Sequence, residues 1–226
     1  MAKSFDPLEA LDRIKNNYRT YVSSFQKFKN PAIREWIDER IDEGTLLYKG
    51  PYIQINRRFS LGDSFDKLVE DDLIHPDTPS CFTVEVTDPS ASPVTLYKHQ
   101  SDAIRSICKD NNTVISTGTG SGKSFCFGVP VVSKCLDMKE QGIHGIKAIF
   151  IYPMNALANS QYDDFSQRLN GSGLKIAIYT GDTPSTRDEA LRSYQERTGR
   201  KEPYDSEILS REEIQDNLPD ILITNY

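Results

Sequence analysis

The stretch STGTGSGKS at residues 116–124 decides how this chain is interpreted. Glycines alternate with hydroxyl residues in it, and Gly118, Gly120 and Gly122 allow positive φ angles and a close approach of the backbone to a ligand. This composition is typical of a loop that surrounds phosphate groups. The strict form of that loop begins with glycine, whereas this chain has Thr117 at that position.

The residues on either side of this stretch give it a recognisable context. The short apolar run TVIS at 113–116 predicts a strand before the loop, and residues 123–142 predict a helix after it, with Pro130 inside the helix. Free N–H groups of the first helical turn would then face the ligand. Lys123 would bind the β- and γ-phosphates, and the hydroxyl of Ser124 would bind Mg²⁺, so these two residues are the catalytic candidates.

Strands and helices alternate in the second part of the chain. Apolar segments predict strands at 147–153, 175–182 and 220–226, and longer periodic segments predict helices at 96–110 and 156–171. Alternation of this kind favours an α/β fold, in which a parallel sheet is covered by helices on both faces.

The first part of the chain reads as a mostly helical region. Apolar residues at three- and four-residue steps predict a helix at 6–25, and the pair Asn30–Pro31 predicts the start of a second one. An extended segment at 45–59, a short helix at 64–74 and a connector at 75–93 are expected to follow. We therefore expect an N-terminal accessory region at 1–92 and a second domain at 93–226.

Composition restricts the class of protein. The sequence has 226 residues, of which 37% are hydrophobic, a net charge of −6 and no apolar run long enough for a membrane span. Its four scattered cysteines and the absence of a secretory signal near residue 1 predict a cytoplasmic protein with reduced thiols. The acidic balance does not favour nucleic-acid binding, but helix N-termini and hydroxyls can also bind phosphates.

Five segments in this order resemble the superfamily 2 helicases of the DEAD/DEAH-like type: LYKHQ, TGTGSGKS, YPMNALANSQ, YTGD and ILITNY. The resemblance covers about residues 95–226 and accommodates Thr117. It implies the first RecA-like lobe of an ATP-dependent motor, with ATP and Mg²⁺ as cofactors and Gln100 as the reader of adenine. The ATP-binding residues that it implies are Tyr97, Gln100, Thr117, Gly118, Thr119, Gly120, Ser121, Gly122, Lys123 and Ser124.

The same resemblance implies a nucleic-acid track and partners. DNA is the expected substrate, with RNA as the alternative, and a second RecA-like lobe is the expected partner. The family usually has Arg or Lys where this chain has Asn155. The implied strand contacts are Pro153, Asn155, Ser160, Gln161, Gly181 and Thr224. A protein partner could bind through residues 1–92.

Segments 55–59 and 72–79 and the long insertion at 192–220 resemble large prokaryotic helicases of antiviral defence, such as the helicase of the DISARM system. Hydrolysis in this class needs a strand that ends in Asp-Glu, and no segment here ends that way. We therefore expect the chain to be the first part of a larger protein and to be inactive alone. The alternatives are a self-contained P-loop kinase or NTPase that uses Asp182, and a binding module without hydrolysis.

Overall fold

A computed structural model describes residues 6–25, 28–43, 47, 59–82 and 95–226. The chain divides into two compact units, Met1–Arg57 and Arg58–Tyr226. No helix in the described part is both long enough and apolar enough to cross a bilayer.

The first unit contains the two helices that the sequence predicts, α1 (Pro7–Phe25) and α2 (Pro31–Asp42). Asn30 caps α2, because its side chain accepts a hydrogen bond from the backbone N–H of Ala32 at 3.0 Å, and Pro31 fits the first helical turn. None of the residues of α1 is buried. Most of the extended segment predicted at 45–59 lies outside the described residues.

The second unit begins with a group of short elements that precede the main sheet in the chain. Its elements are β1 (Leu61–Ser64), α3 (Phe65–Glu70), α4 (Thr78–Phe82), β2 (Thr95–Tyr97) and α5 (Lys98–Ile107). Strands β1 and β2 pair in antiparallel fashion, and the hydroxyl of Ser101 on α5 accepts from the backbone N–H of Asp63. Residues 61–82 therefore lie in the second unit, whereas the sequence placed them in the region 1–92.

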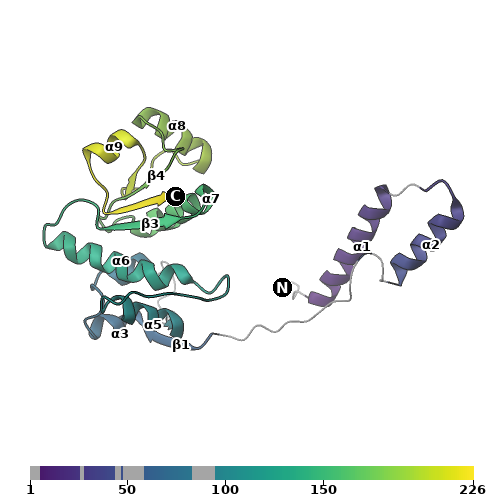
Figure 1. Cartoon of the computed structure of the whole chain (residues 1–226), viewed down its shortest axis with the longest axis horizontal. Coiled ribbons are helices and arrows are strands. Elements are labelled where there is room, and N and C mark those ends of the chain that lie inside the picture. Colours follow the sequence, from purple (N-terminus) through teal and green to yellow (C-terminus); the bar gives the residue numbers. More distant parts are fainter. Residues whose placement is uncertain (1–5, 26–27, 44–46, 48–58, 83–94) are drawn as a thin grey trace, which may run out of the picture. The chain divides into compact units, whose positions relative to one another are not determined.

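The main sheet has four parallel strands in the order β3-β6-β4-β5 (Figure 1). The elements of this half are α6 (Lys123–Glu140), β3 (Ala148–Tyr152), α7 (Asn155–Leu169), β4 (Ile176–Tyr179), α8 (Arg187–Thr198), β5 (Glu207–Ile208), α9 (Arg211–Asp216) and β6 (Ile221–Asn225). Strand β6, the last in the sequence, lies between β3 and β4, so residues far apart in the chain become neighbours.

Helices cover both faces of this sheet. Ile176, Ile221 and Ile223 point to one face, where they pack in the main core with buried residues of α6 and α7. Ala177 and Leu222 alternate to the other face, where they pack with Ile208 and with Ile214 of α9. The predicted α/β fold with a parallel sheet and helices on both faces is confirmed.

The strand predicted at 113–116 is wrong. Residues 111–118 form no strand, and the side chain of Val114 is 95% exposed. A strand needs a neighbour with which to exchange backbone hydrogen bonds and a face to bury. The run TVIS has neither in the described part of the chain, because no strand of the sheet pairs with it and the side chain of Val114 is almost fully open to solvent. The helix predicted after the loop is present as α6, with Pro130 inside it.

A buried ion pair fixes the amino ends of the strands. The ammonium group of Lys147, whose side chain is 2% exposed, donates to Asp220 Oδ1 at 2.5 Å, and Oδ2 of the same carboxylate accepts from the backbone N–H of Lys175 at 2.6 Å. These three residues precede β3, β6 and β4. The pair therefore aligns the three strands, and their carboxyl ends lie at a common edge.

The packing of α6 on α7 depends on Gly128. A Cβ added there would lie 2.8 Å from ring atoms of Phe165, which is fully buried. We expect Gly128→Val to lower the free energy of unfolding by about 1–3 kcal/mol, because the ring has no free volume to enter. Urea denaturation measures this change. Gly181→Ala is the matched control, since its added Cβ meets nothing within 4 Å. Equal stability of the two variants would contradict the packing described here.

Candidate nucleotide and nucleic-acid site

Glycine is required by the geometry at the end of the phosphate-type loop. Gly122 caps α6 with φ 71° and ψ 38°, and Gly120 has φ 75°. Both values lie in the left-handed region that side chains with a Cβ disfavour. The chain therefore turns sharply into α6, and the first turn of that helix begins at Lys123. The free N–H groups of this turn lie beside the loop.

Gln100 ties this turn to the preceding helix. Its side chain is buried, with 5% of the residue exposed. Nε2 donates to the carbonyl oxygen of Gly122 at 2.9 Å, and Oε1 accepts from the backbone N–H of Tyr97 at 2.8 Å. A Cβ on Gly122 would come within 2.5 Å of that Nε2. One amide thus holds the start of α5 and the start of α6 together, so Gln100 positions the loop.

Thr117 has a structural use in the loop. Its Oγ1 lies 2.7 Å from Oγ of Ser121, a buried residue, and the ring of His99 contacts the carbonyl oxygen of Ser121 through Nε2 at 2.9 Å. Glycine at position 117 would leave the buried Ser121 hydroxyl without this partner. The departure from the strict glycine pattern therefore closes the loop by a hydrogen bond between side chains.

The cation of the loop is held by neutral groups. Lys123 Nζ donates to the carbonyl oxygens of Thr117 and Gly118 at 2.8 and 2.7 Å. A carbonyl dipole satisfies the ammonium group without cancelling its charge, so a phosphate can replace it. The hydroxyl of Ser124 donates to Oε1 of Gln161 at 3.4 Å, a long contact that a stronger ligand can displace. The positions of Lys123 and Ser124 fit a nucleoside triphosphate with Mg²⁺.

Gln161 lies beside Ser124, at the start of α6. Besides Ser124, its Oε1 accepts from the hydroxyl of Tyr152 at 3.5 Å. Burial raises the pKa of Tyr152 to about 12, so this phenol remains a proton donor at neutral pH. The structure therefore brings Gln161 close to Ser124, and its contact with nucleic acid stays a prediction. Ser160 and Pro153 are exposed.

Aromatic rings lie next to Gln100, and the sequence alone did not single out two of them. The ring centroid of Phe59 is 5.2 Å from that of Tyr97 and 5.1 Å from that of His99, and the Tyr97 and His99 rings stack at 5.8 Å. Phe59 is far from residues 97–99 in the chain and reaches them because β1 pairs with β2. No spacing rule in the sequence signals such a pairing.

A second polar cluster lies at the carboxyl edge of the sheet. Nδ2 of Asn155 donates to Asp182 Oδ2 at 2.6 Å, and Oδ1 of Asn155 accepts from the side-chain amide of Asn225. The hydroxyl of Thr224 donates to the carbonyl oxygen of Tyr179 at 2.7 Å. The structure thus brings together Asn155, Thr224 and the turn that contains Gly181, since these residues follow or end β3, β6 and β4.

Arg211 is a residue of this edge that sequence reasoning missed. Its Nη2 donates to the carbonyl oxygens of Thr180 and Gly181, both at 3.0 Å. The guanidinium carbon lies 5.3 Å from the ring centroid of Tyr179. Arg211 begins α9 inside the long insertion, and no pattern in the sequence places that insertion against the turn at 180–181.

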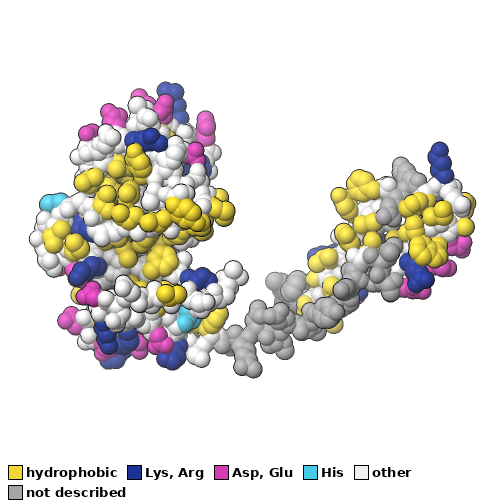
Figure 2. Space-filling view, viewed as in Figure 1, with side chains coloured by type: hydrophobic (Ala, Val, Ile, Leu, Met, Phe, Trp, Pro, Cys, Tyr) yellow, Lys and Arg dark blue, Asp and Glu magenta, His cyan; other side chains and the backbone are white. Residues whose placement is uncertain are grey.

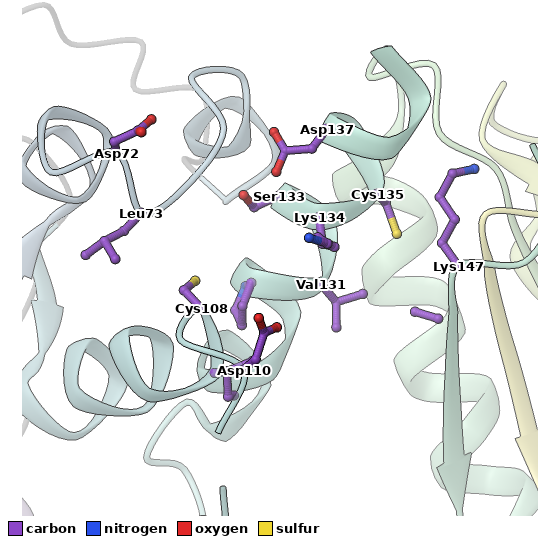
Figure 3. A pocket seen from close by; sticks show the side chains of 13 residues that line it. Asp72, Leu73, Cys108, Asp110, Val131, Ser133, Lys134, Cys135, Asp137 and Lys147 are labelled. Carbon is purple, nitrogen blue, oxygen red and sulfur yellow. The ribbon is translucent and has the colours of Figure 1, made fainter. Parts of the chain in front are cut away.

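A cavity of about 370 Å³ lies away from both clusters. Figure 3 shows it between the end of α5, the middle of α6 and the start of β3, with Asp110, Asp137, Lys134 and Lys147 among its lining residues. None of the loop residues 117–124 lines it. Its position at the amino ends of the strands separates it from the phosphate-type loop.

Comparisons with known proteins identify the family to which the second unit is similar. A family model described as DEAD/DEAH box helicase matches residues 97–220. Druantia protein DruE of Escherichia coli is 23% identical over 96% of this chain, and the archaeal ATP-dependent DNA helicase Hel308 of Thermococcus kodakarensis is 34% identical over 49% of it. The chain covers 16% and 9% of the lengths of these two relatives.

Among solved structures, the crystal structure of the DUF1998 helicase MrfA bound to DNA and AMPPNP aligns with a TM-score of 0.49. The sequence identity is 20%, and the alignment covers 83% of this chain and 21% of that one.

The bridging role of Gln100 predicts a loss of stability in Gln100→Leu. Leucine has a similar volume but leaves the Tyr97 N–H and the Gly122 carbonyl without partners, so we expect unfolding to become easier by about 1–3 kcal/mol. Urea denaturation of the chain without nucleotide measures this change. Asp102→Asn, an exposed position on the same helix, is the control. A Gln100→Leu variant as stable as the control would rule out the bridge.

Proposed function

Because the chain belongs to the DEAD/DEAH box helicase family, we propose that its second unit carries the first RecA-like lobe of an ATP-dependent helicase or translocase. DNA is the proposed substrate, with RNA as the alternative. The proposal is carried by the loop at 117–122 and its contacts. Gln100 donates a hydrogen bond to the carbonyl oxygen of Gly122 at the end of the loop, and Lys123 donates to the carbonyl oxygens of Thr117 and Gly118 at its start. The rival kinase and the rival module without hydrolysis are not favoured, since the family model matches a helicase.

The proposed roles at the loop follow from its contacts. Mg·ATP would supply the phosphoanhydride bond whose hydrolysis drives the motor. Lys123 would exchange its two carbonyl partners for phosphate oxygens, and Ser124 would turn its hydroxyl from Gln161 to the metal. Thr117, Gly118, Thr119, Gly120, Ser121 and Gly122 would surround the phosphates with backbone N–H groups.

Two features beside the loop would bind the base of ATP. The ring faces of Phe59 and Tyr97 offer a stacking surface, and both residues are partly exposed. Gln100 already uses Nε2 and Oε1 within the protein, so reading adenine requires it to share or exchange one of these bonds. Adenine recognition by Gln100 stays a prediction of the family resemblance.

The nucleic-acid track would run along the carboxyl edge of the sheet, where open α/β sheets place their ligands. We propose contacts from Pro153, Asn155, Ser160, Gln161, Gly181 and Thr224. Asn155 is uncharged and is held between Asp182 and Asn225, so it would act as a hydrogen-bond donor rather than as a cation. Backbone N–H groups and hydroxyls would supply the remaining phosphate contacts. This arrangement fits a chain with a net charge of −6.

The wider setting is part of the same proposal. Closure of a second RecA-like lobe on ATP would tighten and release the strand, and residues 1–92 would offer a surface for a protein partner. A cytoplasmic location and a role in antiviral defence stay predictions. The described residues contain no group of three His, Cys, Asp or Glu side chains that could hold a metal ion. Ser124 would be the ligand that the loop contributes to Mg²⁺, with phosphate and water among the others.

Substitution of Lys123 tests the nucleotide site. We expect Lys123→Ala to weaken Mg·ATP binding about 10-fold to 100-fold, because a charge-assisted contact to phosphate is lost. Isothermal titration calorimetry on the 226-residue chain measures the affinity. Ser124→Ala should reduce the gain in affinity that Mg²⁺ gives, and Ser160→Ala, an exposed hydroxyl on α7, is its control. Unchanged affinity in Lys123→Ala would refute the proposed site.

A further inference from the structure

Tyr179 ends β4 with much of its surface open to solvent. Side chains alternate along a strand, so Tyr179 points to the same face as Ala177. Ala177 is fully buried in the cluster with Ile208 and with Ile214 of α9, whereas Tyr179 is 40% exposed. The aromatic ring therefore lies just beyond the part of the sheet that α9 covers.

Arg211 fixes this ring from one side. Its guanidinium carbon is 5.3 Å from the Tyr179 ring centroid, and its Nη2 is held by the carbonyl oxygens of Thr180 and Gly181. The backbone N–H of Arg211 also donates to the carbonyl oxygen of Pro184 at 2.9 Å. The cation is thus oriented by the backbone on both sides of the turn.

Neighbours across the sheet extend this surface. In the strand register Tyr179 pairs with Thr224, and Thr224 pairs with Ile151, so the three side chains form a row on one face. Ile151 is 63% exposed. Figure 2 shows hydrophobic side chains gathered over the strands at this end of the sheet. The row is next to Gly181 and includes Thr224, two of the proposed strand contacts.

We propose that the Tyr179 ring is a stacking platform for a nucleobase of single-stranded nucleic acid, with Arg211 as the cation on its other side. This inference rests on the proposed function. It adds a contact with a base to the proposed track, which otherwise contacts the phosphate backbone of the nucleic acid. Aromatic rings stack on every base, so the platform gives affinity without sequence preference. The fixed guanidinium adds a positive charge that attracts the adjoining phosphate.

The test compares two oligonucleotides and two variants. The chain is titrated with a short fluorescein-labelled oligothymidine and with an abasic oligonucleotide of the same length, and fluorescence anisotropy gives the affinities. We expect Tyr179→Leu to weaken oligothymidine binding about 5-fold to 100-fold and to leave abasic binding unchanged. Tyr179→Phe keeps the ring and should bind within about 2-fold of the original chain. Thermal denaturation checks that all variants are folded.

Each other outcome has a distinct meaning. An equal loss for both oligonucleotides in Tyr179→Leu overturns the platform, because the ring would then only support the backbone contacts. Equal affinity of the original chain for the two oligonucleotides also overturns it, while the proposed function stands. If the original chain binds neither oligonucleotide, the proposed nucleic-acid track itself fails.

Discussion

The hydrogen bond from Gln100 to the carbonyl oxygen of Gly122 is the contact on which the proposed nucleotide site depends. Gly122 adopts a left-handed conformation to turn the chain into α6, and the Gln100 amide occupies the space that a Cβ would need. The same amide accepts the Tyr97 N–H at the start of α5. The two helices therefore share one buried side chain, and the orientation of the loop follows from their packing. Because both polar atoms of the buried amide are hydrogen-bonded, its burial leaves neither atom without a partner.

The site also shows how an acidic chain can present a place for anions. Lys123 is balanced by two carbonyl dipoles, Arg211 by the carbonyl oxygens of one turn, and the glycines expose N–H groups. None of these arrangements neutralises the positive charge with a carboxylate. The net charge of −6 is therefore a poor guide to the local potential at the loop and at the sheet edge.

The local patterns in the sequence predicted the elements that depend on local chemistry. The Asn30–Pro31 cap, the strands β3, β4 and β6, and α6 with Pro130 inside it are where the sequence indicated. The strand at 113–116 failed because four residues carry no information about whether a partner strand is present. Gly181 and Thr224, which the resemblance implied as strand contacts, lie at one edge because parallel strands end together. The roles of Phe59 and Arg211 could not be predicted, because both reach the site through pairings of distant segments.

The most direct measurement is a crystal structure of the chain with Mg²⁺ and a non-hydrolysable ATP analogue. We expect Lys123 Nζ to leave the carbonyl oxygens of Thr117 and Gly118 for the β- and γ-phosphates, and Ser124 to bind the metal. The bond from Gln100 Nε2 to Gly122 should persist, because it holds the turn into α6, and adenine would share this bond or replace the one between Oε1 and the Tyr97 N–H. An analogue bound elsewhere, or a Lys123 that remains on its two carbonyls with the phosphates in place, would contradict the proposed site.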